Sequence, residues 1–104
     1  MSKVSVAPGI CGLRTTIDCY VDDSYQASVT IESDCAQVSH LADRLGQISV
    51  FDELRAPLHE STIYREAGAC RLHTACPVPS AILKAIEVAA GLALPADVHV
   101  AIER

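Results

Sequence analysis

Two consecutive segments in which apolar and polar residues alternate strictly are the main constraint on the fold. In residues 13–21, one face consists of Leu13, Thr15, Ile17, Cys19 and Val21, which are apolar except for the threonine, and residues 25–32 repeat the alternation. A period of two is typical of a β-strand with one buried face. The polar cluster Asp22-Asp23-Ser24 between the segments predicts a turn. We therefore expect an antiparallel β-hairpin with one buried face.

The same alternation restricts the register of the hairpin, because a shift of one residue would turn one apolar face to water. A pairing with Ile17 opposite Val29 keeps both apolar faces on one side. If no bulge interrupts the ladder, this register continues outward until position 11 lies beside position 35. Cys11 and Cys35 are thus predicted to be neighbours at the open end of the hairpin.

Two longer helices are expected after the hairpin. The first runs from about Asp34 to Gly46, with Asp34 as the N-cap and Gln37 reaching back to it. The second runs from about Pro79 to Ala90, since prolines are tolerated in a first helical turn and a glycine followed by a proline ends a helix. Both helices carry an apolar face at helical spacing.

The remaining elements are shorter. Residues 1–7 suggest a frayed strand, residues 51–54 a short helical turn, residues 61–69 a short helix, and residues 98–102 a last strand. This order predicts an α+β fold: an antiparallel sheet, made of the hairpin and the C-terminal strand, with two main helices and one or two short helices packed on one face. The whole of residues 1–104 is expected to form a single domain.

The charge balance excludes some partners. The chain carries 8 basic and 13 acidic residues, a formal net charge of −5. Nucleic acid is therefore not an expected partner. No segment has the length and hydropathy of a membrane span, and no signal-peptide pattern is present. These features favour a cytoplasmic protein without a membrane partner.

Five cysteines are many for such a chain, and their odd number argues against a disulfide framework. Cys19 lies on the inward face of a strand and is assigned to the core. Cys11, Cys35 and Cys76 each lie at the boundary of an element. Cys76 also precedes a helix, where the helix dipole favours a thiolate.

If both main helices start at the same end of the hairpin, Cys76 joins Cys11 and Cys35 in a three-thiolate site. Thiolates select zinc or an iron–sulfur cluster, and a closed site needs a fourth ligand. Cys70 is the first candidate, followed by His73 and Asp34. The predicted metal ligands are therefore Cys11, Cys35, Cys76 and Cys70, and the cofactor is an iron–sulfur cluster or zinc.

Other catalytic patterns are missing. The sequence has no Ser-His-Asp arrangement, no Gly-x-Ser-x-Gly motif and no phosphate-binding glycine loop. We therefore assign no catalytic residues, and a binding protein is favoured over an enzyme.

Three stretches together resemble a small uncharacterised cysteine-containing domain family found mainly in anaerobic bacteria and archaea. They are Pro-Gly-Ile-Cys-Gly at 8–12, Ser-Asp-Cys at 33–35, and the segment 75–87 that begins Ala-Cys-Pro-Val-Pro. The resemblance covers nearly the whole chain and implies no function.

A looser resemblance is to iron–sulfur scaffold proteins of the NifU N-terminal or IscU type and to TSCPD domains. In both groups, a cysteine at the end of a strand opens a helix, and a second cysteine starts the last main helix. Cys35 and Cys76 match these positions, and Thr-Ala-Cys-Pro at 74–77 is similar to the Thr-Ser-Cys-Pro signature. The chain departs from the scaffolds in lacking their middle cysteine at a clear matching place, in using Cys11 from a preceding loop, and in the position of Asp34 relative to Cys35. The resemblance therefore implies a thiolate site rather than cluster assembly itself.

Three functional hypotheses follow. The first is a thiolate protein that binds a metal ion or an iron–sulfur cluster, as a scaffold or carrier. The second is a thiol, persulfide-transfer or redox protein that uses Cys76 or Cys35. The third is an interaction module whose cysteines are only structural and whose partner is another protein or a second copy of the chain.

Overall fold

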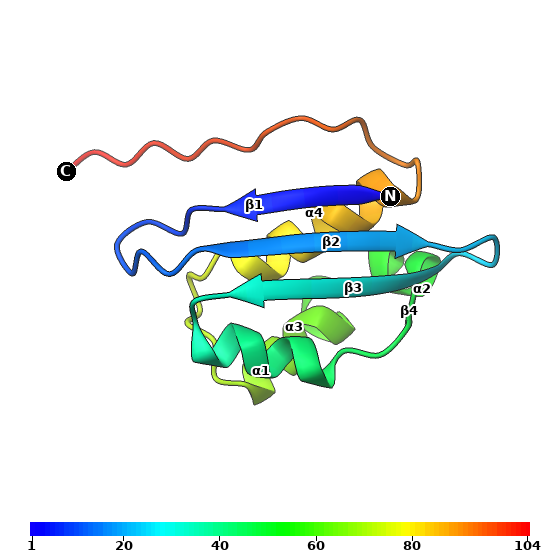
Figure 1. Cartoon of the computed structure of the whole chain (residues 1–104), viewed down its shortest axis with the longest axis horizontal. Coiled ribbons are helices and arrows are strands. Elements are labelled where there is room, and N and C mark those ends of the chain that lie inside the picture. The colour runs from blue at the N-terminus through cyan, green and yellow to red at the C-terminus, as the bar shows by residue number, and fades with distance from the viewer.

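The computed structural model describes all residues, 1–104, and its centre is a four-stranded antiparallel sheet. The strands follow one another across the sheet in chain order (Figure 1): β1 (Ser2–Val6), β2 (Thr15–Val21), β3 (Gln26–Ser33) and β4 (Ile48–Ser49). Their alternation is that of a sheet with one covered face, because Ile17 and Cys19 are buried whereas Tyr20 on the opposite face is 58% exposed.

Helices cover only the apolar face of the sheet. The main helices α1 (Ala36–Arg44) and α4 (Val78–Ala89) pack directly on it, α1 against β3 and α4 against β1 and β2. The shorter elements are α2 (Val50–Arg55), the 3₁₀ helix η1 (Leu58–Glu60) and α3 (Thr62–Ala69), and α3 packs against both main helices. The predicted α+β class, with its helices on one face, is confirmed.

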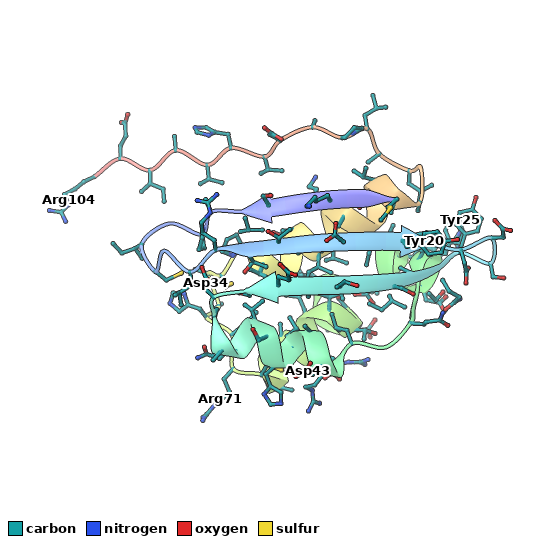
Figure 2. The ribbon with its side chains drawn as sticks, in the orientation of Figure 1. Tyr20, Tyr25, Asp34, Asp43, Arg71 and Arg104 are labelled. Carbon is teal, nitrogen blue, oxygen red and sulfur yellow. The ribbon has the colours of Figure 1, made fainter.

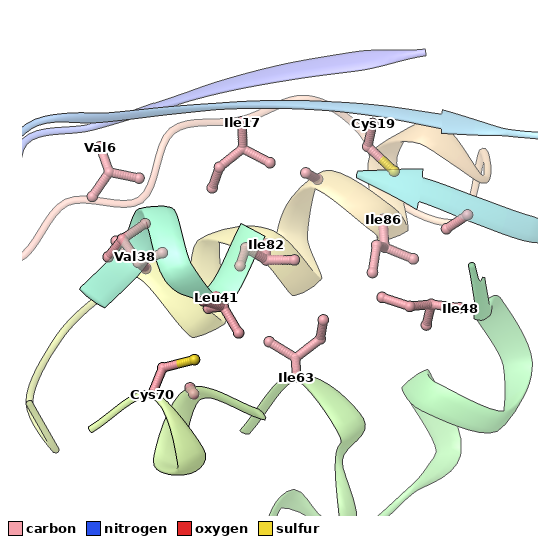
Figure 3. Close-up of a cluster of buried hydrophobic side chains, with 14 of the residues drawn as sticks. Val6, Ile17, Cys19, Val38, Leu41, Ile48, Ile63, Cys70, Ile82 and Ile86 are labelled. Atoms are coloured by element: carbon pink, nitrogen blue, oxygen red, sulfur yellow. The ribbon is translucent and has the colours of Figure 1, made fainter. Parts of the chain in front are cut away.

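The hydrophobic core lies between the sheet and the helices (Figure 3). Ile17 of the sheet faces Ile82 and Ile86 of α4, and Leu41 and Ile63 continue the core toward α3. All five of these side chains are fully buried. None of the helices has the length and apolar character needed to span a membrane.

The hairpin forms as predicted, but its register differs by two residues. Ile17 lies opposite Ile31, and Val29 lies opposite Cys19. Tyr25 adopts a left-handed φ of 57° and belongs to the turn, so β3 begins one residue later than expected. Because a shift of two residues keeps every side chain on its own face, the alternation could not distinguish the two registers.

This register corrects the expectation that Cys11 and Cys35 are paired across the hairpin. The last paired residues of the ladder are Thr15 and Ser33, whose hydroxyls lie 2.7 Å apart. Cys11 lies beyond them in the loop between β1 and β2.

The predicted strand at residues 98–102 is absent. Residues 92–104 carry no helix or strand, and β1 forms a full edge strand where only a frayed one was expected. The backbone of β1 pairs with β2 alone. The sheet thus reaches four strands through β1 and the short β4.

The predicted N-cap of the first helix is also wrong. The N-cap of α1 is Cys35, and its side chain makes no capping hydrogen bond. The backbone N–H of Asp34 instead donates to the carbonyl of Arg14 at 3.0 Å, which keeps Asp34 in line with the end of the sheet. The hydroxyl of Ser33 accepts a hydrogen bond from the Cys35 N–H at 3.0 Å.

The helices predicted near residues 51–54 and 61–69 are confirmed as α2 and α3, and a buried carboxylate joins them. Glu53 is only 6% exposed. Its two oxygens accept hydrogen bonds from the hydroxyl of Ser61, from Thr62 N at 2.9 Å and from Ile63 N at 3.0 Å. Ser61 in turn accepts from Tyr64 N at 3.2 Å. Glu53 thus satisfies the free N–H groups at the start of α3.

We predict that Glu53→Gln lowers the free energy of unfolding by about 1–3 kcal/mol, because the amide replaces one accepting oxygen by a donor that faces other donors. Urea unfolding followed by circular dichroism measures the change. Asp52→Asn, an exposed neighbour on the same helix, is the matched control and should have little effect. Equal stability of Glu53→Gln and the wild-type chain would show that this carboxylate does not stabilise α3.

Candidate thiol site

Cys11 lies at the tip of an exposed loop, residues 7–14. One backbone hydrogen bond, from Gly12 N to Gly9 O at 3.0 Å, closes the turn. Gly9 and Gly12 have φ angles of 95° and 68°, which glycine adopts without the steric cost that other residues meet. Cys11 is exposed, and its neighbour Ile10 is 102% exposed. The loop therefore presents a thiol that the core does not cover.

Cys35 is held where β3 passes into α1. As the N-cap residue it has extended backbone angles, φ −89° and ψ 124°, and its side chain is partly buried. The thiol donates a hydrogen bond to Oε1 of Gln37 at 3.3 Å. Gln37 was expected to serve a capping box with Asp34, but it contacts the thiol instead.

Cys76 lies just before α4 and is partly buried. A turn places it there, since Cys76 N donates to the carbonyl of His73 at 2.9 Å. Pro77 is the N-cap, and Pro79 lies in the first turn of the helix, where its missing N–H costs no helical hydrogen bond. The helix spans Val78–Ala89, one residue earlier than predicted at each end. His73 is exposed.

The segments that carry these three cysteines lie at the same end of the sheet (Figure 1). The loop of residues 7–14, the start of α1 and the start of α4 are all at the left of that view, and the turn of the β2–β3 hairpin is at the right. The two main helices therefore start at the same end. No three His, Cys, Asp or Glu side chains are grouped closely enough to hold a metal ion.

Cys19 and Cys70 are core residues in the structure. Cys19 is 1% exposed between the sheet and α4, and burial raises the pKa of its thiol. Cys70 caps the C-terminus of α3, is 5% exposed, and lies near Leu41 and Ile63 (Figure 3). Of the candidates for a fourth ligand, Asp34 and His73 are exposed and Cys70 is not.

Sequence reasoning missed an aromatic cluster at the opposite end of the sheet. The rings of Tyr25 and Phe51 have centroids 4.9 Å apart, and the guanidinium of Arg55 lies 5.3 Å from the centre of the Phe51 ring. Figure 2 shows Tyr25 at the hairpin turn. The left-handed backbone of Tyr25, which directs its ring to Phe51, had no signal in the alternation.

A shallow recess of about 270 Å³ lies beside α2 and was not expected from the sequence either. Acidic residues line much of it: Asp52, Glu53 and Glu60. Glu53 is fully occupied by the donors of α3, so the recess offers no free buried carboxylate.

These features define the class of the protein: a small α+β protein with two thiols buried in its core, and with one exposed and two partly buried thiols on segments at one end of the sheet. The chain belongs to the Family of unknown function (DUF6951), whose model matches residues 2–102. No curated protein and no solved structure matches the chain.

Because burial raises the pKa of Cys19, we predict that the free energy of unfolding decreases at alkaline pH. The folded-state pKa lies above the value in the unfolded chain, so the stabilisation is complete below the unfolded pKa of about 9 and is lost as pH rises through the folded value. We expect the wild-type chain to lose more unfolding free energy between about pH 7.5 and pH 10 than Cys19→Val, because valine has no proton to release. Urea unfolding of both chains at the two pH values tests this, and equal losses would contradict it.

Proposed function

We propose that this chain binds a soft metal ion, zinc, or an iron–sulfur cluster through the thiolates of Cys11, Cys35 and Cys76. One observation carries the proposal: Cys11 is exposed and Cys35 and Cys76 are only partly buried, all on segments at one end of the sheet, whereas Cys19 and Cys70 are buried. Thiolates are the ligands that such metals prefer. The similarity of residues 74–77 to the Thr-Ser-Cys-Pro signature points in the same direction.

Binding requires the loop of residues 7–14 to bring Cys11 toward the two helix starts. Residues 7–13 of the loop have the features of a segment that moves at low cost, since they have a single backbone hydrogen bond and Ile10 at the tip contacts little. Cys35 and Cys76, in contrast, are fixed by the starts of α1 and α4. In this proposal the helices hold two ligands and the loop closes on the metal with the third.

A fourth ligand completes a closed thiolate site. Asp34 and His73 are exposed and precede Cys35 and Cys76 by one and three residues. Cys70 has to leave the core before it can coordinate a metal. Asp34 and His73 are therefore the more accessible donors, and a variant of each candidate distinguishes them.

An anaerobic titration with Co²⁺, a spectroscopic substitute for zinc, tests the proposal. We expect thiolate-to-cobalt absorption that saturates at one equivalent, and a loss of affinity of at least about tenfold in each of Cys11→Ser, Cys35→Ser and Cys76→Ser. Cys19→Val is the control that keeps these three thiols and should bind normally. The same titration of Cys70→Ala, His73→Ala and Asp34→Ala identifies the fourth ligand.

Two results would contradict the proposal. One is the absence of thiolate absorption with cobalt together with the absence of a cluster after anaerobic reconstitution with iron and sulfide. The other is equal binding by the wild-type chain and the variant that lacks all three thiols, which would place the metal elsewhere.

A second candidate function, thiol or persulfide transfer, rests on Cys35. This thiol occupies the N-cap of a nine-residue helix, where the helix dipole stabilises negative charge. The exposed Cys11 provides an internal reference for an ordinary thiol. If Cys35 is a nucleophile, alkylation near neutral pH followed by mass spectrometry should label it several times faster than Cys11, although it is the more buried of the two. Slower labelling of Cys35 than of Cys11 would exclude this function.

A further inference from the structure

The last thirteen residues, 92–104, form an extended segment that the rest of the chain does not use, and we call it the C-terminal arm. No hydrogen bond involves any residue from 93 to 104. Val98, Val100 and Ile102 are 67%, 76% and 89% exposed. They alternate with Asp97, His99, Ala101 and Glu103, so the arm has the sequence of a strand with one apolar face and lacks a sheet to join.

Strand β1 lies at the edge of the sheet, and no strand pairs with its outer side. In the β2–β3 ladder, Asp22 N donates to Gln26 O and Asp34 N to Arg14 O, so even-numbered residues of β2 bond to β3. The odd-numbered residues of β2 therefore bond to β1, where Ile17 pairs with Val4. It follows that Lys3 and Ser5, at alternate positions of β1, point their N–H and C=O groups away from the sheet.

Apolar surface continues beyond this edge on the flank of α4. The hydroxyl of Ser2 donates to the carbonyl of Ala85 at 2.7 Å and fixes β1 over the helix. Leu83 borders a second recess, which Leu54 of α2 and Leu58 of η1 also line. The opposite flank of α4, which carries the half-buried Ala81 and Val88, therefore lies toward β1. A strand added to β1 would place its inward side chains against this flank.

The arm of the same chain is badly placed to be that strand. It runs in the same direction as β1 and continues past the end of β1, so that Arg104 lies well outside the sheet (Figures 1 and 2). Residues 95–104 span about 33 Å when extended, and the five residues of β1 about 17 Å. Strand β1 could therefore pair with only about half of the arm of its own chain, and the two strands would be parallel.

A second copy of the chain removes the restriction to a parallel pair and lets the five residues of β1 pair with the part of the arm that carries Val98, Val100 and Ile102. Its arm can enter β1 antiparallel, which is the more stable pairing, and its own edge accepts the first arm in return. The exchange uses each arm and each edge once and closes at two copies. Charge also fits: with the valines inward, Asp97 and Glu103 lie on the outer face with Lys3. We propose that the chain forms a two-fold dimer in which each C-terminal arm adds as a strand to β1 of the other copy.

Sedimentation and light scattering across a concentration series test the dimer. The full chain should show about twice its mass of 11.0 kDa, and a chain ending at Leu94 should be monomeric and folded. Val100→Lys should weaken the dimer about a hundredfold, because two buried valines are lost for each dimer. His99→Lys adds the same charge to the outer face of the arm and should leave the dimer intact.

The acceptor edge is tested by Ser5→Pro, which removes an outward N–H that the β2 ladder does not use, with Ser5→Ala as the control. Loss of the dimer in the proline variant alone supports the proposal. A monomeric full chain overturns it, whether or not hydrogen exchange finds Lys3 and Ser5 protected by the chain's own arm. A dimer that survives deletion of the arm, or one that depends on the arm but not on Ser5→Pro, also overturns it.

Discussion

Burial of one face of the sheet is the interaction on which the rest of the structure depends. Ile17 of β2 is fully buried against α4, whose own Ile82 and Ile86 are fully buried in return. The opposite face carries polar groups, so helices gain nothing by packing there and all of them lie on one side. Since β3 passes directly into α1, and α4 returns along β1 and β2 from the same end, the helix starts are placed by core packing and need no interaction between cysteines.

Most of the architecture could be predicted because it depends on periodicity. The two alternating segments define the hairpin, and the helical spacing with its prolines and Gly91 defines α4 to within one residue at each end. Register is different, because an even shift leaves the pattern of buried residues unchanged. The turn fixes the register, since Asp22 Oδ1 accepts hydrogen bonds from Ser24 N at 2.8 Å and from Gln26 N at 3.0 Å. The predicted proximity of Cys11 and Cys35 rested on that register.

The other differences arise from contacts that a pattern in one segment does not encode. Alternation at residues 98–102 specifies a strand but does not specify a neighbour, and within one chain β1 is left with a free edge. The sequence around Glu53 is that of an exposed position on a short helix. In the structure, the start of α3 supplies three hydrogen-bond donors to its carboxylate. For the candidate site, boundary positions could be recognised from turns and prolines. Which thiols approach one another depends on loop conformation, and the sequence pattern does not constrain it.

The two ends of the sheet differ in how firmly they are held. At the hairpin turn, the Tyr25 ring packs against Phe51 at a tilt of 47°, and the Tyr25 carbonyl accepts a hydrogen bond from Val50 N at 3.0 Å, so both contacts hold the turn against α2. At the other end, residues 7–13 have one backbone hydrogen bond, that of their own turn, and Ile10 is fully exposed. Local opening costs least where few buried contacts are lost, and ligand-binding segments are commonly of that kind. The exposed thiol and the two partly buried thiols thus lie at the end of the molecule where a conformational change disturbs the core least.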